Sequence, residues 1–452
     1  EDGKALKRRH RALGVCYYPE HWPEEAWDTD AKQMADAGIE YVRIGEFMWS
    51  LVEPSPGVWE WGLLDRAVET LAKHGLKIVL GTPTACPPKW LVDQDPSVLP
   101  YDAEARPRTF GSRRHYSFSS AAYREHSERV CSAMAERYGQ HPSVVGWQLD
   151  NEYGCHDTIR TYDPNARDAF RGWLSRKYRN IEALNEAWGT RFWSMEYRSF
   201  DEVDLPDSTI VTEPCPIHRL DFFRFSSDQV ISYNAVQISC VAQRSPKRWI
   251  THNFMMLFFD FDAWAVGQSL SFCTYDSYPL GFTDTTLGLS DIFSAEQKIH
   301  FAKTGHPDLA PFHHDLHRCM SRNKRFWIME QQPGPVNWAG HNPAPAPGMV
   351  RLWSWEAFSH GADVVSYFRW RQVPFAQEQM HAGLNKPDYT PDVGLIEAKQ
   401  VVAEIRHLED TLSKRSEATS GDSAWEEGIS SVQKAALILD FEAHWVSVIQ
   451  PQ

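Results

Sequence analysis

Two kinds of segment alternate along most of the chain, and this alternation limits the possible folds more than any other feature. Short apolar runs typical of β-strands occur at residues 13–18, 39–44, 76–81, 143–152, 248–253, 269–275, 325–330 and 363–368. Longer segments with helical spacing lie between most of these runs, at residues 24–37, 63–74, 121–138, 219–244, 296–304 and 353–360. Repeated strand–helix units predict parallel strands covered by helices. Eight such strands predict an α/β protein with a (β/α)8 TIM barrel.

Two parts of the chain depart from this pattern. Residues 154–216 are too long for a strand-to-helix loop and contain helical patterns near 164–177 and 181–188, so we interpret them as a subdomain inserted after strand four. A last barrel helix at 397–412 would end the catalytic domain, residues 1–412. The polar residues 413–432 predict a linker. A strand-like run at 435–441 then suggests that residues 433–452 are the incomplete start of a second α/β domain.

Charge and composition exclude several classes of partner. The 452 residues carry a formal charge of −14, so a phosphate-rich partner would be repelled and nucleic acid binding is not expected. The apolar run 254–266 is interrupted by Asp260 and Asp262, and no segment approaches the roughly 20 apolar residues that span a bilayer. The eight cysteines are scattered and form no C-x-x-C pair, which favours reduced thiols and a cytoplasmic location.

Two glutamates mark the most informative strand ends. Glu152 follows the apolar run of strand four, and Glu330 follows that of strand seven. Barrels of parallel strands carry their chemistry at the carboxyl ends of the strands. Two carboxylates at such a site can cleave a glycosidic bond, with retention of configuration if they lie about 5–5.5 Å apart and with inversion if they lie roughly 6.5–9.5 Å apart. The alternative for each glutamate alone is an ion pair that fastens the strand end to a loop, but the pairing and the adjacent Asn151 favour catalysis.

Other side chains near strand ends could bind a sugar. Arg113 follows strand three and could donate hydrogen bonds to hydroxyl groups. Trp193 and Trp338 could be flat platforms for a sugar ring. Glu378 and His381 follow strand eight at a spacing of three residues and could bind neighbouring hydroxyl groups. For each of these residues the alternative is ordinary packing or a loop ion pair.

Several motifs together resemble glycoside hydrolase family 42, the β-galactosidases of a large retaining clan built on this barrel. They are residues 14–22, 42–47, 110–116, 150–154, 192–194 and 329–334, and the resemblance covers nearly the whole chain. It implies a retaining exo-β-galactosidase that hydrolyses terminal non-reducing β-D-galactosides, with Glu152 as acid/base and Glu330 as nucleophile.

The resemblance also implies a galactose subsite and an assembly. The subsite would contain Arg113, Asn151, Trp193, Trp338, Glu378 and His381, with Asn151 on the 2-hydroxyl group. Members of the family form homotrimers, so a homotrimer is expected. No cofactor is implied. Some members bind zinc through four cysteines, but the matching positions here carry Ser117, Thr161, Asp163 and Ala166, so we expect no metal.

Three alternatives stay open at this stage. The nearest is an α-L-arabinopyranosidase or another glycosidase of the same clan, since arabinopyranose lacks only the hydroxymethyl group of galactose. A carbohydrate-binding protein without catalysis is less favoured because both carboxylates are present. A structural subunit is the third. The sequence does not specify the natural galactoside or its linkage.

Overall fold

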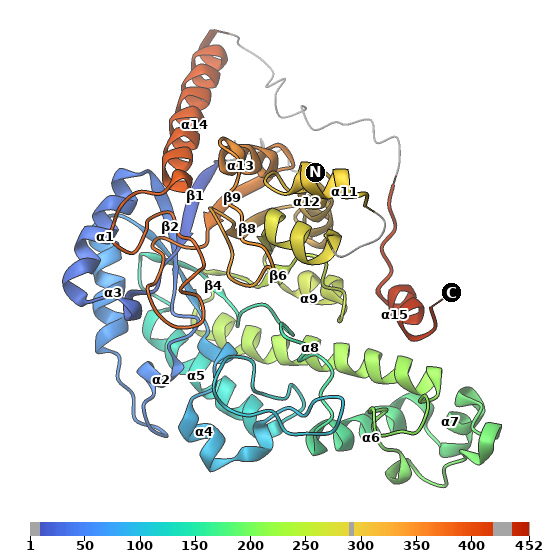
Figure 1. Cartoon of the computed structure of the whole chain (residues 1–452). Helices are drawn as coiled ribbons and strands as arrows, with labels where there is room; N and C mark the ends of the chain where they lie inside the picture. Colours follow the sequence, from blue (N-terminus) through green and yellow to red (C-terminus); the bar gives the residue numbers. More distant parts are fainter. Residues whose placement is uncertain (1–9, 289–292, 419–435, 452) are drawn as a thin grey trace. The chain divides into compact units, whose positions relative to one another are not determined.

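The computed structural model describes residues 10–288, 293–418 and 436–451 (Figure 1). The chain divides into two compact units, each built from segments that are distant in sequence. The first contains residues 1–44, 67–79 and 272–439; the second contains residues 45–66, 80–271 and 440–452. Helix α3 (Gly62–Lys73) and strand β3 (Lys77–Gly81) are divided between the two units.

The first unit contains five adjacent parallel strands. They are, in spatial order, β2 (Ile39–Ile44), β1 (Ala12–Cys16), β9 (Ala362–Tyr367), β8 (Phe326–Gln331) and β7 (Cys273–Ser277) (Figure 1). Every residue of β1, β7, β8 and β9 is buried. Parallel strands covered on both faces need continuous apolar runs, which is the pattern that these sequences have.

Helices follow the strands of this unit in the expected alternation. They are η1 (Pro19–His21) and α1 (Glu24–Asp36) after β1; α10 (Pro279–Phe282), η6 (Thr283–Leu287), α11 (Ala295–Phe301) and α12 (Leu309–Met320) after β7; α13 (Met349–Ser359) after β8; and α14 (Val393–Ala418) after β9. The predicted sixth strand, residues 269–275, begins later than expected, because Ser269 is still the last residue of helix α9 (Ala263–Ser269).

The second unit contains the parallel pair β4 (Val144–Gln148) and β5 (Trp249–Thr251), and the short strand β6 (Asn253–Met255). Its long helices α5 (Ala121–Tyr138) and α8 (Pro216–Arg244) pack against each other. The shorter helices are α2 (Trp49–Val52), η2 (Pro83–Ala85), α4 (Lys89–Gln94), η3 (Pro96–Val98), α6 (Pro164–Tyr178), α7 (Ile181–Trp188), η4 (Phe192–Ser194) and η5 (Phe200–Glu202).

Strand five is interrupted where the sequence predicts one continuous strand. Its two parts, β5 and β6, flank the buried His252. The Nδ1 atom of His252 lies 2.8 Å from the carbonyl oxygen of Leu149, and its ring stacks on Tyr153 with centroids 3.9 Å apart. The imidazole therefore binds the end of strand four and divides strand five into two short parts.

The predicted helices of the inserted region are confirmed, and local capping explains where they begin. Asp163 accepts a hydrogen bond from the amide of Ala166 at the start of α6, and Asn180 does the same for Ala183 in α7. A buried cluster joins α6, α7, α8 and the C-terminal helix. It consists of Ala166, Phe170, Leu174, Leu184, Trp188, Val203, Leu205, Phe222, Phe223, Phe225, Trp445 and Ile449.

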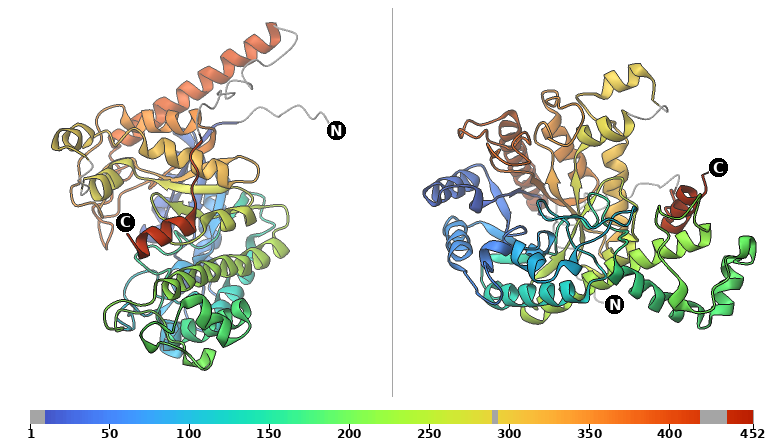
Figure 2. Two further views of the ribbon diagram at one scale, coloured as in Figure 1. Left: turned by 90° about the vertical axis from the view of Figure 1, so that its right-hand side faces the viewer. Right: turned by 60° about the horizontal axis from the view of Figure 1, so that its bottom comes forward.

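The predicted strand at 435–441 is wrong for the part of the segment that the structure describes. Residues 436–440 are not in a strand, and Phe441 begins helix α15 (Phe441–Ile449). Phe441, Trp445 and Ile449 recur every four residues, so a helix places them on one face, against the cluster on α8. Figure 2 shows the ribbon of α15, in red, next to that of α8. The predicted linker, 413–432, overlaps the end of α14 at Ala418, and the rest of it lies outside the described residues.

Three further features concern membrane spans, cysteines and metal ligands. Among the described residues, no helix is long and apolar enough to cross a bilayer. All eight cysteines are free thiols. Two of the positions at which some family members carry zinc-binding cysteines form a polar contact here, since the Ser117 and Thr161 hydroxyl oxygens lie 3.2 Å apart.

A buried histidine on α8 predicts a loss of stability in acid. His218 stacks on Trp188, lies against Phe170, and its Nε2 is 3.0 Å from the carbonyl oxygen of Asp204. Burial lowers the pKa of His218 to about 4. In the unfolded chain the His218 imidazole takes up a proton near pH 6.5. The free energy of unfolding therefore keeps its full value above that pH. It falls by about 3 kcal/mol as the pH drops to 4.

His218→Gln should therefore flatten the dependence of the unfolding free energy on pH between 6.5 and 4, as measured by urea denaturation at several pH values. His444→Gln on α15 is the matched control, because it removes an exposed imidazole from the same unit. An unchanged slope in the His218 variant would contradict the prediction.

Candidate active site

The two candidate catalytic glutamates belong to different units, so each is described with its own neighbours. Glu330 is the last but one residue of β8 and is only 5% exposed. Arg43 on β2 donates a 2.7 Å hydrogen bond to its Oε1 atom, and the Tyr278 hydroxyl donates a 2.5 Å hydrogen bond to Oε2. Both carboxyl oxygens are thus bound by fixed donors that orient the side chain at the end of the strand.

A series of side-chain contacts connects Glu330 to Glu378. Arg43 also donates to the Tyr18 hydroxyl at 3.0 Å, and the guanidinium of Arg369 lies 4.6 Å from the centre of the Tyr18 ring. Arg369 is buried and donates to Glu378 Oε2 at 3.0 Å and to His21 Nδ1 at 2.6 Å. Burial and the charge of Arg369 lower the pKa of His21 to about 4, so its imidazole is neutral and accepts this bond.

Tyr278 brings two other predicted site residues together. The buried ring of His381 lies 5.7 Å from the Tyr278 ring, and the ring of Trp338 lies 5.6 Å from it at an angle of 86°. Trp338 is 41% exposed and packs directly over Gly281, where a Cβ atom would lie 2.3 Å from the indole. Trp338 and His381 therefore both contact Tyr278, the residue that binds Glu330. Glu378 is connected to Glu330 less directly, through the contacts of Arg369 described above.

Glu152 lies in a turn, not in the strand that the sequence predicts up to this residue. Strand β4 ends at Gln148, and both Asp150 and Glu152 have positive φ angles, 51° and 45°. The Gln148 side chain donates to the carbonyl oxygen of Asp150 at 2.9 Å and so closes the turn. After Gln148, hydrogen bonds to polar side chains therefore stabilise the backbone in place of hydrogen bonds between strands.

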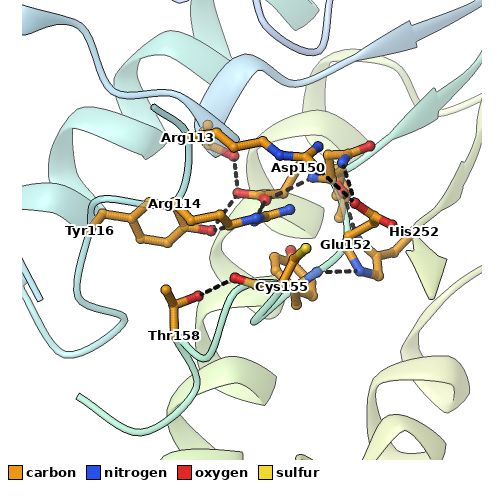
Figure 3. Close-up of polar contacts among 12 residues, drawn as sticks. Arg113, Arg114, Tyr116, Asp150, Glu152, Cys155, Thr158 and His252 are labelled. Carbon is orange, nitrogen blue, oxygen red and sulfur yellow. Dashed lines mark hydrogen bonds and ion pairs between the residues drawn. The ribbon is translucent and has the colours of Figure 1, made fainter. Parts of the chain in front are cut away.

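Glu152 contacts Asn151, Arg113 and Asn253. The Oε2 atom of Glu152 accepts a 3.3 Å hydrogen bond from the Asn151 side chain. The same oxygen lies 3.4 Å from a guanidinium nitrogen of Arg113 (Figure 3). The Glu152 backbone amide donates to Asn253 Oδ1 at 3.2 Å, and Asn253 donates to Asn151 Oδ1 at 2.9 Å. The second unit therefore brings Arg113 and Asn151 to Glu152 as predicted, with Asn253 as an additional anchor.

Beneath this group lies a buried ion pair that the sequence analysis did not identify. Asp150 accepts hydrogen bonds from Arg114 at 2.6 Å, from the Tyr116 hydroxyl at 3.0 Å and from the Thr84 hydroxyl at 2.6 Å (Figure 3). It also accepts one from the backbone amide of Asn151 at 2.7 Å. Burial and the neighbouring Asp150 raise the pKa of Tyr116, so the phenol stays protonated and donates. Asp150 thereby orients the Asn151–Glu152 segment.

The adjacent arginines Arg113 and Arg114 allow a matched test of this pair. Arg114→Met should destabilise the protein by about 3–5 kcal/mol, because it leaves the fully buried Asp150 carboxylate without its charged partner. Arg113→Met should cost under about 1 kcal/mol, because that ion pair is longer and its arginine is 26% exposed. Urea denaturation measures both, and equal losses in the two variants would contradict the assignment.

Trp193 is the one predicted site residue that stands apart. It lies in η4 with a φ angle of 56°, is 74% exposed, and its ring contacts Phe192 at 4.7 Å. Its described contacts are with this neighbour and not with Glu152, Asn151 or Arg113.

The four positions at which some family members carry zinc-binding cysteines hold Ser117, Thr161, Asp163 and Ala166 here. At the positions of the zinc cysteines, Asp163 instead accepts the amide hydrogen bond of Ala166 at 3.0 Å.

Each unit thus has a glutamate near the end of a strand: Glu330 is bound by two fixed donors, and Glu152 lies beside Asn151. The family model described as "Beta-galactosidase" matches residues 16–408, and the chain belongs to this family, glycoside hydrolase family 42. It is 58% identical over 442 residues to a β-galactosidase of Thermus thermophilus, covering 97% of this chain and 64% of that protein. It is 44% identical over 440 residues to the β-galactosidase Bga of Halorubrum lacusprofundi, covering 97% and 59%.

Solved structures agree with this assignment. The β-galactosidase of the psychrophilic Marinomonas ef1 superposes with a TM-score of 0.90 at 52% identity, covering 97% of this chain and 65% of that chain. The Halorubrum lacusprofundi enzyme superposes with a TM-score of 0.86 at 42% identity, covering 97% and 62%. The predicted (β/α)8 TIM-barrel fold is thereby confirmed. The chain spans less than two thirds of the length of each of these relatives.

Proposed function

We propose that the protein is a retaining exo-β-galactosidase that hydrolyses terminal non-reducing β-D-galactosides. The observation that carries the proposal is the setting of Glu330, whose two oxygens are bound by Arg43 and Tyr278 at a buried strand end. A nucleophile needs this fixed orientation, since a displaced carboxylate loses the alignment for attack. The relatives named β-galactosidase support galactose as the sugar.

In this mechanism Glu330 attacks the anomeric carbon while Glu152 protonates the leaving glycosidic oxygen. The bond between the anomeric carbon and the leaving oxygen breaks, and a covalent galactosyl-enzyme forms on Glu330. Glu152, now deprotonated, takes a proton from water, whose oxygen attacks the same carbon and releases β-galactose. Glutamates on strands four and seven of a barrel act at the same rim, and we predict a carboxyl separation of about 5–5.5 Å for retention.

The residues that gather around each glutamate supply the proposed galactose subsite. Asn151 is held by Asp150 and Asn253 and would bind the 2-hydroxyl group, whose hydrogen bonds strengthen in the transition state. Arg113 would bind beside it. Trp338 would provide an apolar wall, and Glu378, oriented by Arg369, would bind further hydroxyl groups together with His381.

We also propose a homotrimer and a cytoplasmic location. Eight free thiols are consistent with a reducing compartment. The exposed Trp193 would complete the sugar site only in the assembly, since its described contacts are with Phe192. Size-exclusion chromatography with light scattering tests the assembly state, and a monomer at micromolar concentration would overturn it.

A panel of nitrophenyl glycosides tests the activity. The β-D-galactoside should give the highest kcat/KM, and proton NMR during the first turnovers should show β-galactose before it mutarotates. Preference for the α-L-arabinopyranoside would replace the proposed substrate with the pentose. Binding of galactose without turnover of any glycoside would identify a non-catalytic protein. Initial formation of α-galactose would rule out the retaining mechanism.

A further inference from the structure

His21 has no role in the proposed hydrolysis, although it is bonded to the side chain that orients Glu378. Its Nδ1 atom accepts a 2.6 Å hydrogen bond from one terminal nitrogen of Arg369, and the other terminal nitrogen donates to Glu378 Oε2 at 3.0 Å. All three residues belong to the first unit. One buried guanidinium therefore joins an imidazole of η1 to a residue of the proposed galactose subsite.

The imidazole of His21 is held in place on several sides. Its ring stacks on Tyr18 with centroids 5.1 Å apart at an angle of 16°, and the Phe375 ring lies 5.9 Å away at 75°. The His21 backbone amide donates to the carbonyl oxygen of Tyr18 at 3.0 Å. Trp27 Nε1 donates to the carbonyl oxygen of Pro19 at 2.9 Å and so ties the first residue of η1 to α1. The acceptor that Arg369 meets therefore has a fixed position.

Arg369 depends on this acceptor because its guanidinium is shielded from water. The residue is 2% exposed, and the guanidinium carbon lies 4.6 Å from the centre of the Tyr18 ring and 5.5 Å from that of Phe368. Its terminal nitrogens are bonded to His21 and Glu378. Without the His21 acceptor, a buried charged donor would lose its partner, and the guanidinium would move towards another acceptor. Glu378 would then lose the donor that orients it.

Only a neutral imidazole can accept the hydrogen bond from Arg369. Burial and the charge of Arg369 lower the pKa of His21 to about 4, whereas the Glu378 carboxylate acts in the opposite direction. The ring itself meets the aromatic rings of Tyr18 and Phe375, and Glu20 precedes His21 on η1. The imidazole therefore accepts above pH 4. Below that pH it takes up a proton, and two positive charges then face each other.

We propose that His21 is a positioning residue that acts through Arg369 to hold Glu378 in the orientation that binds galactose hydroxyl groups. His21 thereby contributes to selectivity for the sugar. Glu330 has its own donors, Arg43 and Tyr278, so the orientation of the nucleophile does not need His21. The choice of galactose rests on the proposed function, whereas the dependence of Glu378 on His21 does not.

A double-mutant cycle tests whether His21 acts through Glu378. His21→Ala should lower kcat/KM for nitrophenyl β-D-galactoside by about 10-fold or more, because it releases Arg369. In a Glu378→Gln background the same change should have less than about a 3-fold effect, since the carboxylate that it positions is already absent. Phe375→Leu is the control, because it removes a ring contact of His21 and keeps the acceptor. Equal effects of His21→Ala in both backgrounds would overturn the proposal.

The pH dependence of KM distinguishes positioning from a purely structural role. His21→Asn places an amide oxygen near the position of Nδ1, and this oxygen accepts a hydrogen bond but takes up no proton. The variant should recover part of the loss seen in His21→Ala. Between pH 6 and pH 4, KM should rise more steeply in the wild-type protein than in His21→Asn, because only the wild-type acceptor becomes protonated. The same rise in both proteins would overturn the proposal.

Calorimetric titration with galactose keeps this inference separate from the proposed function. The same cycle of variants can be measured as binding, with no turnover required, and His21→Ala should weaken galactose binding only where Glu378 is present. Absence of hydrolysis by the wild-type protein would overturn the proposed function, while the binding cycle would still decide the role of His21. Additive losses of galactose affinity in the double variant would overturn that role even in a fully active enzyme.

Discussion

Replacing Glu330 by glycine is expected to lower kcat for nitrophenyl β-D-galactoside by about 10⁴-fold or more. Loss of a covalent nucleophile removes the step that forms the glycosyl-enzyme, and comparable losses reach about 10⁶-fold in other hydrolases. The surrounding donors, Arg43 and Tyr278, would then face an empty space where the carboxylate was bound. Steady-state kinetics at saturating substrate measures the effect.

Azide provides the positive control for this variant. The anion is small enough to enter the space left by the carboxylate, and there it can attack the anomeric carbon from the face that Glu330 would use. Activity should therefore return with added sodium azide, and the product should be α-galactosyl azide. Glu330→Gln should be inactive and resist rescue, because the amide fills that space. Normal turnover without azide in either variant would contradict the nucleophile assignment.

The strand–helix alternation predicts most of the fold because buried parallel strands need continuous apolar sequence. Predicted strands at 39–44, 325–330 and 363–368 agree with β2, β8 and β9 to within one residue at each end. The same reasoning placed strand four too far along the chain, because Leu149 is apolar while the backbone has already turned at Asp150. Hydrophobic pattern does not report a turn that side-chain hydrogen bonds create.

The C-terminal segment was predicted as a strand but forms helix α15 from Phe441 onwards. A short apolar run in isolation is compatible with a strand or with a helix. The four-residue spacing of Phe441, Trp445 and Ile449 favours a helix, and Asp440 caps it by accepting the amide hydrogen bond of Ala443 at 3.1 Å. The helix forms because its apolar face packs on the α8 cluster, a contact across more than 200 residues of sequence.

The sequence identified most of the side chains proposed to bind the sugar. It did not identify the residues that position those side chains. Arg113, Asn151, Trp338, Glu378 and His381 lie beside the glutamate of their own unit or are linked to it, but their catalytic and binding roles stay predictions. Arg43 was detectable in principle, because an arginine inside the apolar strand 39–44 needs a buried partner. The partners Tyr278, Asn253 and Asp150 depend on tertiary contacts that a single sequence does not encode locally.

Replacing Glu152 by alanine is expected to lower turnover by an amount that depends on the leaving group. Galactosides with a poor leaving group, such as lactose, should lose about 10²–10⁴-fold in kcat/KM, because the departing oxygen is no longer protonated. A dinitrophenyl galactoside has an acidic leaving group that needs no proton, so its first step should be nearly unchanged. The glycosyl-enzyme should then accumulate, because water also loses its general base.

The structure supplies the matched control for this prediction. Arg113→Met removes a neighbour that lies 3.4 Å from Glu152 but leaves the acid in place, so its effect should be similar for all leaving groups. Azide should accelerate the Glu152→Ala variant and give β-galactosyl azide, since it attacks the covalent intermediate from the face opposite Glu330. The opposite anomers from the two glutamate variants would assign the two roles independently. If Glu152→Ala lowered kcat/KM equally for lactose and for dinitrophenyl galactoside, Glu152 would not be the proton donor.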